Sequence, residues 1–292
     1  MIPSFGKQAK TNRESKWNDS FSFVQAADTQ FGLIDRYILH KDKITWTKEI
    51  YYLKLVIQSI NQLSPLPKFL VICGDLVDAY PYENLAQMRT DQIKDLKEIL
   101  SELNPSIQLV CVCGNHDIGD KPTKETIQLY KKDFGDDYFS FWSNGCKFIC
   151  LNSQLYFDSS LAANERDEQD KWLDMELKQD EETPWKHLII FQHIPLFVDD
   201  SNEPAHVYFN IEPVQRKNLM DRFLKAGVRK VFCGHYHKNA GGFYENNGQK
   251  LECIVTTAIG AQLGDDRHGY RIVNVNENSI EHKYIQVTDQ KN

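Results

Sequence analysis

The sequence has no long hydrophobic run. Nowhere in its 292 residues do 18 uncharged apolar residues follow one another, which argues against a membrane-spanning helix, and no membrane partner is expected. The first 20 residues also lack the apolar stretch of a secretory signal. We therefore expect a cytoplasmic protein.

An excess of basic residues is lacking as well. The chain carries 34 Lys and Arg against 41 Asp and Glu, a formal net charge of −7, and the two signs are interspersed. A protein that holds a nucleic-acid backbone needs a basic stripe that displaces counterions. Nucleic acid is therefore not expected as a partner.

The cysteines do not have the pattern of a disulfide framework. There are seven, an odd number, and six lie in apolar runs of the kind that form buried strands: Cys73, Cys111, Cys113, Cys150, Cys233 and Cys253. Burial accounts for these residues without any bond between them. Free thiols suit a reducing compartment, in agreement with a cytoplasmic location.

Repeats, low-complexity tracts and linkers rich in Pro, Gly or Ser are also missing. We therefore expect an N-terminal extension over residues 1–20 and a single domain over residues 21–288. A monomer is expected.

What the chain does contain is an alternation of short apolar runs and amphipathic segments. The runs predict buried strands at Phe21–Asp28, Phe69–Asp75, Ile107–Asn115, His187–His193 and Val228–His235. Spacings of three and four residues predict helices at Ile44–Leu63, Glu83–Leu103, Lys124–Phe134, Glu165–Gln179 and Val214–Ala226. Hairpins are predicted at Tyr138–Asn152, at Leu251–Gly260 paired back across Asn246-Asn247-Gly248, and at Tyr270–Val287. The fold class is α/β, with one mixed sheet or two sheets packed as a sandwich.

Polar clusters follow the five predicted strands. They are Asp28-Thr29-Gln30, Gly74-Asp75, Gly114-Asn115-His116-Asp117, Gln192-His193 and Gly234-His235-Tyr236-His237. Each alone is more often a turn, a helix cap or an ordinary polar residue. Turn chemistry does not account for several His and an Asn at such places, and ligands of α/β folds bind beyond the carboxyl ends of strands. The clusters together predict a metal site on one rim of the fold.

In content and order these clusters resemble the motifs of the calcineurin-like metallophosphoesterases, D-x-H, G-D-x-x-D, G-N-H-D/E, a lone H and G-H-x-H. Here they read D-T-Q, G-D-L-V-D, G-N-H-D, Q-H and G-H-Y-H. The N-A-G-G that follows and the late Q-L-G-D-D resemble the calcineurin-like phosphoesterase domain-containing branch, whose relatives include serine/threonine phosphatases. The resemblance implies a four-layer α/β/β/α sandwich with two divalent metal ions.

The resemblance also implies a set of ligands. Asp28, Asp75 and His237 would hold the first metal, with Gln30 in place of the usual His, and Asn115, His193 and His235 would hold the second. Asp75 would bridge both ions, since a shared carboxylate offsets the repulsion between cations about 3.5–4 Å apart.

Two residues are expected to act in catalysis without binding metal. His116 would donate a hydrogen bond to the phosphate and protonate the leaving oxygen, and Asp117 would orient and charge its imidazole. The alternative for Asp117 is a helix N-cap.

Gln30 is the main departure from the family pattern. An amide oxygen is a weaker ligand than imidazole and suits Mn²⁺ or Mg²⁺, with iron and zinc as alternatives. We predict that the first metal exchanges readily.

A second departure concerns the substrate. The phosphoprotein phosphatases clamp phosphate with two Arg residues, and the corresponding positions here are Ala79 and Cys113. By resemblance, a phosphomonoesterase acting on phosphoserine or phosphothreonine in proteins is predicted, with a phosphoprotein or a small phosphorylated molecule as partner. The alternatives are a small-molecule or cyclic-nucleotide phosphodiesterase and a non-catalytic interaction module.

Overall fold

The computed structural model describes residues 16–179, 182 and 184–288. Within them, eleven strands form two mixed sheets. The first sheet has the order β11-β10-β1-β2-β3, where β1, β2 and β3 are parallel, β10 is antiparallel to β1, and β11 is antiparallel to β10. Its strands are β1 (Phe21–Ala26), β2 (Phe69–Cys73), β3 (Gln108–Val112), β10 (Gly269–Val275) and β11 (Ile280–Gln286).

The second sheet has the order β4-β5-β6-β7-β9-β8. The four central strands are parallel, and β4 and β8 pair antiparallel at its two edges. Its strands are β4 (Phe139–Ser143), β5 (Cys146–Cys150), β6 (Leu188–Phe191), β7 (Lys230–Cys233), β8 (Ala240–Asn246) and β9 (Gln249–Val255). The two-sheet alternative of the sequence is therefore the observed one.

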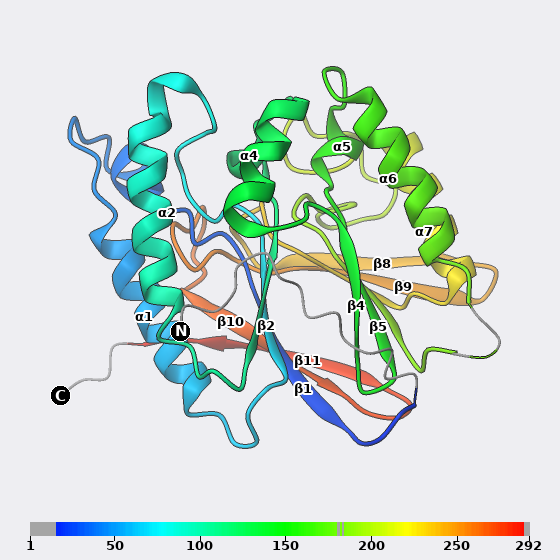
Figure 1. Cartoon of the computed structure of the whole chain (residues 1–292). Coiled ribbons are helices and arrows are strands. Elements are labelled where there is room, and N and C mark those ends of the chain that lie inside the picture. Colours follow the sequence, from blue (N-terminus) through cyan, green and yellow to red (C-terminus); the bar gives the residue numbers. More distant parts are fainter. Residues whose placement is uncertain (1–15, 180–181, 183, 289–292) are drawn as a thin grey trace.

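Helices cover the outer face of each sheet, which gives four layers (Figure 1). The first sheet packs against α1 (Thr47–Asn61), α2 (Ala86–Leu100) and α4 (Lys124–Phe134), and the second against α6 (Ala163–Glu176) and α7 (Pro213–Ala226). Apolar residues three or four apart place one face of each helix on its sheet. The shorter helical segments are η1 (Ile34–Ile38), η2 (Glu83–Leu85), α3 (Asn115–Ile118) and α5 (Gln154–Phe157).

Phenylalanine rings fill the space between the two sheets. Phe23 of β1 stacks on Phe69 of β2 with ring centres 4.7 Å apart. The edges of Phe148, Phe191 and Phe232, from the second sheet, meet the Phe23 ring with ring centres 5.6–5.8 Å apart. Such pairs add to the burial of large apolar surfaces. This core fixes how the strand ends of one sheet face those of the other.

Most of the predicted elements are confirmed. The helix Lys124–Phe134 has the predicted bounds, the five strands lie within the predicted runs, and the three hairpins form. The predicted strands are too long, because their last residues belong to the turns that follow. The sequence did not predict η1, α3 or α5, each too short to show a periodic pattern.

The predicted N-terminal extension falls mostly outside the described residues, which begin at 16. Trp17 packs on Phe21 and edge-on against His187, with ring centres 6.3 and 6.1 Å apart. The described end of this segment therefore packs against β1 and against the residue just before β6.

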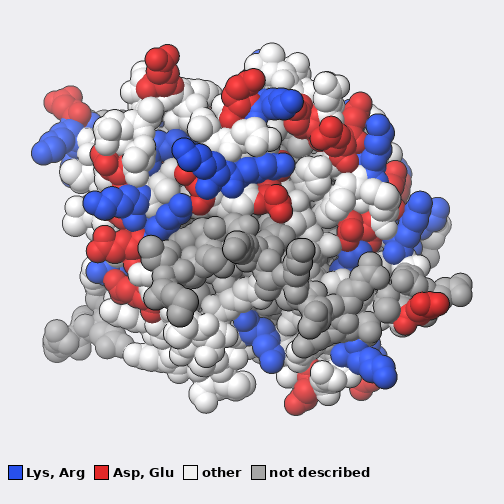
Figure 2. Space-filling view, in the orientation of Figure 1, with Lys and Arg blue, Asp and Glu red and all other residues white. Residues whose placement is uncertain are grey.

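Charges of both signs lie side by side on the face shown in Figure 2. Ion pairs join some of the charged side chains of the protein, for example Arg222 with Asp170 and Asp174 at 2.8 and 3.0 Å. None of the helices in the described part of the chain combines the length and apolarity needed to cross a membrane.

Candidate metal centre

Polar loops follow five parallel strands and meet where the two sheets face each other. Asp28, Asp75 and Asn115 follow β1, β2 and β3, whereas His193 and His235 follow β6 and β7. Backbone hydrogen bonds join the loops, from the Asp28 amide to Gly74 and from the Gly234 amide to His193, each at 3.0 Å. The sequence-predicted clusters therefore lie together.

The backbone at this place adopts an uncommon conformation. Eight non-glycine residues with described placement have positive φ, and five belong to the predicted ligand set: Asp28 at 53°, Gln30 at 37°, Asp75 at 49°, His235 at 69° and His237 at 55°. Side chains with a Cβ avoid this region unless the surrounding structure imposes it, and such residues gather at functional sites. The loops are held in a shape that directs these side chains inward.

Two sets of three side chains have converging ligand atoms. One is Asp75, His193 and His235, and the other is Asp28, Asp75 and His237. In each set the ligand atoms lie within 4.8 Å of one another, and all these residues are buried. Asp75 belongs to both sets, as a carboxylate between two cations requires.

The tautomers of His193 and His235 favour a cation between them. His193 Nδ1 donates to the Cys73 carbonyl at 2.8 Å, and His235 Nε2 donates to the Tyr208 carbonyl at 2.7 Å. The remaining nitrogens, His193 Nε2 and His235 Nδ1, face each other at 3.0 Å. In the neutral rings both carry lone pairs, so a shared cation fits this geometry.

The surrounding charges favour positive charge at one ring of this pair and disfavour it at the other. Burial and the charge of His193 lower the pKa of His235 to about 3. Burial also opposes charge on His193, but Asp75 and Asp28 outweigh it and raise its pKa to about 9. The two carboxylates thus stabilise positive charge beside His193.

Two further side chains present an atom suited to metal binding. Asn115 Nδ2 donates to Asp120 Oδ1 and to the Tyr208 hydroxyl, each at 2.8 Å, which directs its oxygen toward His193 Nε2 at 3.1 Å. His237 Nδ1 donates to the Ala261 carbonyl, and its Nε2 lies 3.5 Å from Asp28 Oδ1. Hydrogen bonds at the far atom are what orient metal ligands in proteins.

The Gln30 side chain provides an independent test of whether this site suits a metal ion. Its side-chain oxygen is buried and has no hydrogen-bond partner among the described residues. A buried polar atom without a partner costs free energy, so such an acceptor is stabilised by a cation. The donor set present here therefore fits a centre for divalent ions.

Two glycines of the motifs are required by close approach. A Cβ on Gly74, which has a φ of 81°, would overlap the His193 imidazole, and one on Gly114 would overlap the Asp75 carboxylate. Any side chain at either place would displace a predicted ligand.

His116 lies beside this cluster, and its hydrogen bonds differ from the prediction. Its Nδ1 donates to the Asp78 carbonyl at 2.7 Å and lies 3.4 Å from Asp78 Oδ1. The Asp117 carboxylate instead accepts from the Gly114 and Leu76 amides at 2.8 and 3.1 Å. Asp117 therefore closes a capping box at the start of α3, where Gly114 and not Asp117 is the N-cap residue, and Asp78 rather than Asp117 contacts the His116 imidazole.

The sequence missed an arginine near His116. Arg36 of η1 binds the Asp78 carboxylate through two nitrogens, Nε at 2.6 Å and Nη2 at 2.7 Å. This forked contact fixes the carboxylate beside His116. Asp78 could have been found from the second Asp of G-D-L-V-D, whereas Arg36 lies in no motif.

The four-layer fold and the two ligand sets define a metal-dependent phosphoester hydrolase. The sequence profile described as calcineurin-like phosphoesterase matches residues 21–239, about three quarters of the chain. The chain belongs to the calcineurin-like phosphoesterase family, as its motifs predicted, and this fold implies a dinuclear metal centre.

Curated relatives align with most of this chain. The human protein named serine/threonine-protein phosphatase CPPED1 is 44% identical over 280 residues, which cover 95% of this chain and 87% of the relative. The Danio rerio protein of the same name is 43% identical over 276 residues, which cover 94% of this chain and 87% of the relative.

Solved structures share the fold at low identity. Purple acid phosphatase PPD1 from yellow lupin seeds superposes with a TM-score of 0.63 at 13% identity, over 95% of this chain and 53% of that one. A dimetal phosphatase from Danio rerio gives 0.58 at 15% identity, over 93% and 100%.

Proposed function

We propose that this chain hydrolyses phosphate monoesters and that its physiological substrates are phosphoserine and phosphothreonine side chains of proteins. The buried ligand sets that share Asp75 carry the proposal of a two-metal hydrolase. The names of the relatives that cover most of the chain support the protein substrate.

We assign the ligands as the motifs predicted. Asp28, Gln30, Asp75 and His237 would hold the first ion, and Asp75, with Asn115, His193 and His235, would hold the second. Mn²⁺ or Mg²⁺ is the proposed metal, because three oxygen donors at the first site suit hard cations. When bound, two such ions neutralise phosphate oxygens and lower the pKa of an attacking water.

The residues around the proposed ions would transfer a proton or hold other side chains in position. The bond from His116 Nδ1 to the Asp78 carbonyl leaves Nε2 to carry a proton to the leaving oxygen. The Asp78 carboxylate lies beside the His116 imidazole, and Arg36 holds that carboxylate in place. The Asn115 amide fixes its own oxygen through Asp120 and Tyr208.

A substrate comparison tests the proposal. With Mn²⁺ or Mg²⁺ added, we expect turnover of p-nitrophenyl phosphate and of phosphoserine peptides, and little of bis-p-nitrophenyl phosphate. Preference for the bis-ester would instead favour a phosphodiesterase. No turnover with Mn²⁺, Mg²⁺, Fe²⁺ or Zn²⁺ would favour an interaction module.

We also propose a cytoplasmic location and a monomeric state. Free, buried cysteines support the location. Cell fractionation and light scattering test the two statements separately.

A further inference from the structure

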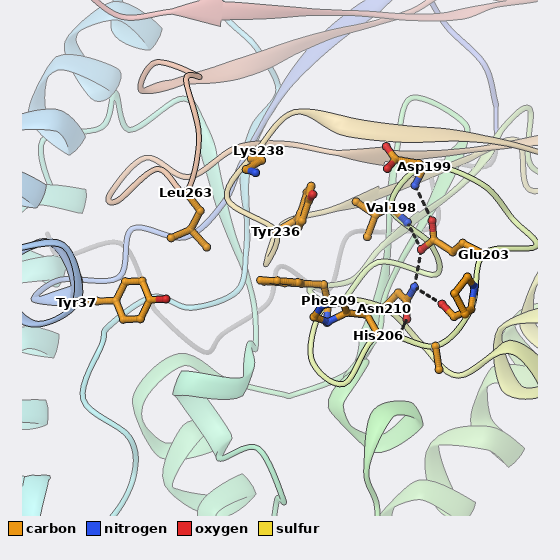
Figure 3. A pocket seen from close by; sticks show the side chains of 12 residues that line it. Tyr37, Val198, Asp199, Glu203, His206, Phe209, Asn210, Tyr236, Lys238 and Leu263 are labelled. Atoms are coloured by element: carbon orange, nitrogen blue, oxygen red, sulfur yellow. Dashed lines mark hydrogen bonds between the residues drawn. The ribbon is translucent and has the colours of Figure 1, made fainter.

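A cavity of about 510 Å³ opens beside the candidate metal centre, and Figure 3 shows the side chains that line this cavity. Its lining includes Tyr236, which stands between His235 and His237 in the chain, and Phe209, whose ring centre lies 5.8 Å from that of His235. A substrate whose phosphate reaches the metal ligands would therefore have its neighbouring atoms next to this cavity. A volume of this size is typical of ligand pockets.

Aromatic and aliphatic side chains from separate segments form the walls. Tyr37 comes from η1, Phe209 from the loop between β6 and α7, Tyr236 from the turn after β7, and Leu263 from the loop before β10. The Phe209 and Tyr236 rings meet edge to face at 5.1 Å. Figure 3 shows Tyr37 across the opening from these two rings. We call this cavity the aromatic pocket.

Two polar side chains that line the cavity, both from the loop between β6 and α7, already form hydrogen bonds within that loop. Glu203 accepts from the amides of Val198, Asp199 and Asp200 at 2.8–3.1 Å. Asn210 donates to Glu203 and accepts from the His206 amide at 2.7 Å. These bonds hold the loop in shape before any ligand arrives, which lowers the cost of binding. Because Glu203 and Asn210 already form these hydrogen bonds, few polar groups on this side of the cavity remain free to bind the edge of a nucleobase.

The remaining charges on the lining are opposite in sign. Asp199 is exposed, and Lys238 forms no ion pair with a carboxylate in the described part of the chain; its ammonium lies 5.4 Å from the centre of the Tyr236 ring. A neutral aromatic ring suits such walls, because it stacks on the rings and attracts the ammonium through its face.

We propose that the aromatic pocket binds an aromatic side chain that flanks the phosphorylated residue of the substrate. The pocket would thereby select phosphoproteins by the sequence around the phosphate. This inference rests on the proposed function, since it presumes a peptide substrate.

Phosphoserine peptides in an alanine background, each with one Phe at a position from −3 to +3, test the proposal. We expect kcat/KM for the best Phe peptide to exceed that of the all-Ala peptide by about 10-fold, as burial of most of a ring predicts. In Tyr37→Ala this ratio should fall below about 3. Tyr37→Phe should keep it, because the ring remains.

Tyr51→Ala is the matched control, because Tyr51 is about as exposed as Tyr37, 46% against 54%, and lies on α1 outside the pocket. Its ratio should equal that of the wild type. Equal rates for Phe and Ala peptides, or a preference that survives Tyr37→Ala, would refute the pocket assignment alone. Competition by ADP that Tyr37→Ala abolishes would make the pocket a nucleotide site. An enzyme that hydrolyses p-nitrophenyl phosphate but none of the phosphoserine peptides would refute the proposed substrate class itself.

Discussion

At the scale of single residues, Gln30 has the most specific consequence for the metal centre. Its unpartnered oxygen supplies an amide where the family pattern has imidazole. We predict that Gln30→His retains more metal than the wild type after dialysis against a chelator, because imidazole binds divalent transition ions more strongly. Gln30→Leu, which has no donor, should retain less. Metal analysis by mass spectrometry measures both, and equal retention in all three proteins would contradict the assignment.

Asp75 and His116 should respond differently to substitution. Asp75→Asn removes a charge shared by both ligand sets, so we predict loss of activity together with loss of both ions. His116→Ala should keep the ions and lose about 10²–10⁴ in rate, the range for general acid catalysis. Metal content and activity, both measured on each variant, check this difference between the two substitutions. Similar metal loss in both variants would show that His116 has another role.

The sequence predicted residues of this site unevenly. Asp75, Asn115 and the three histidines of the ligand set stand in short motifs whose order is informative without any structure. Arg36 could not be predicted, because it reaches Asp78 from a π-helical segment 42 residues earlier. The sequence paired Asp117 with His116, but adjacent side chains on a tight turn point in different directions, and Asp117 binds the Gly114 amide instead.

At the scale of secondary structure, the buried strands and amphipathic helices were predictable because their periods are clear. The pairing of strands between two sheets was not, because β10 and β11 join the first sheet after the chain has completed the second. Such long-range pairing leaves no local signal.

One contact between the sheets has a measurable pH dependence. Glu252 of β9 binds Lys230 of β7 and accepts from His282 of β11 at 3.1 Å. Burial raises the pKa of Glu252, but these two partners outweigh it and lower the pKa from 4.5 to about 2. The pKa is depressed on folding, so the carboxylate stabilises the fold above pH 4.5, and this contribution is lost as the pH falls toward 2.

We therefore predict that Glu252→Gln lowers the thermal midpoint at pH 7 by several degrees. The difference in thermal midpoint between the wild type and the variant should shrink between pH 4.5 and 2. Its size follows from the hydrogen bond to a charged group, which contributes about 1.5–3 kcal/mol to stability. Glu245→Gln is the control, because its pair with Lys250 at 2.9 Å is 65% and 51% exposed and contributes little. A pH-independent difference would mean that the charge is unimportant.

At the scale of the whole molecule, the cysteines predict how the chain responds to thiol reagents. All seven are buried and unpaired, and burial raises the pKa of Cys73 and Cys111 to about 12. Thiolates are the reactive form, so the native protein should react slowly with Ellman's reagent, and seven thiols should react in guanidinium. Rapid reaction of several thiols in the native state would contradict this burial.

The phenylalanine core predicts cooperative behaviour. Because Phe23 contacts rings from both sheets, we propose that residues 21–288 unfold as one unit. Calorimetry should give a single transition, whereas two separated transitions would divide the chain into independent parts.

The origin of the ligands in both sheets has a further consequence. Asp28, Asp75 and Asn115 leave the first sheet, and His193, His235 and His237 leave the second. Side chains of both groups would hold the proposed ions, so bound ions would connect the two sheets of the fold. By mass action, each tenfold rise in free ion above the dissociation constant adds about 1.4 kcal/mol to stability. A cell depleted of the ion would hold a protein that is shorter-lived as well as inactive, so its abundance would report on metal supply.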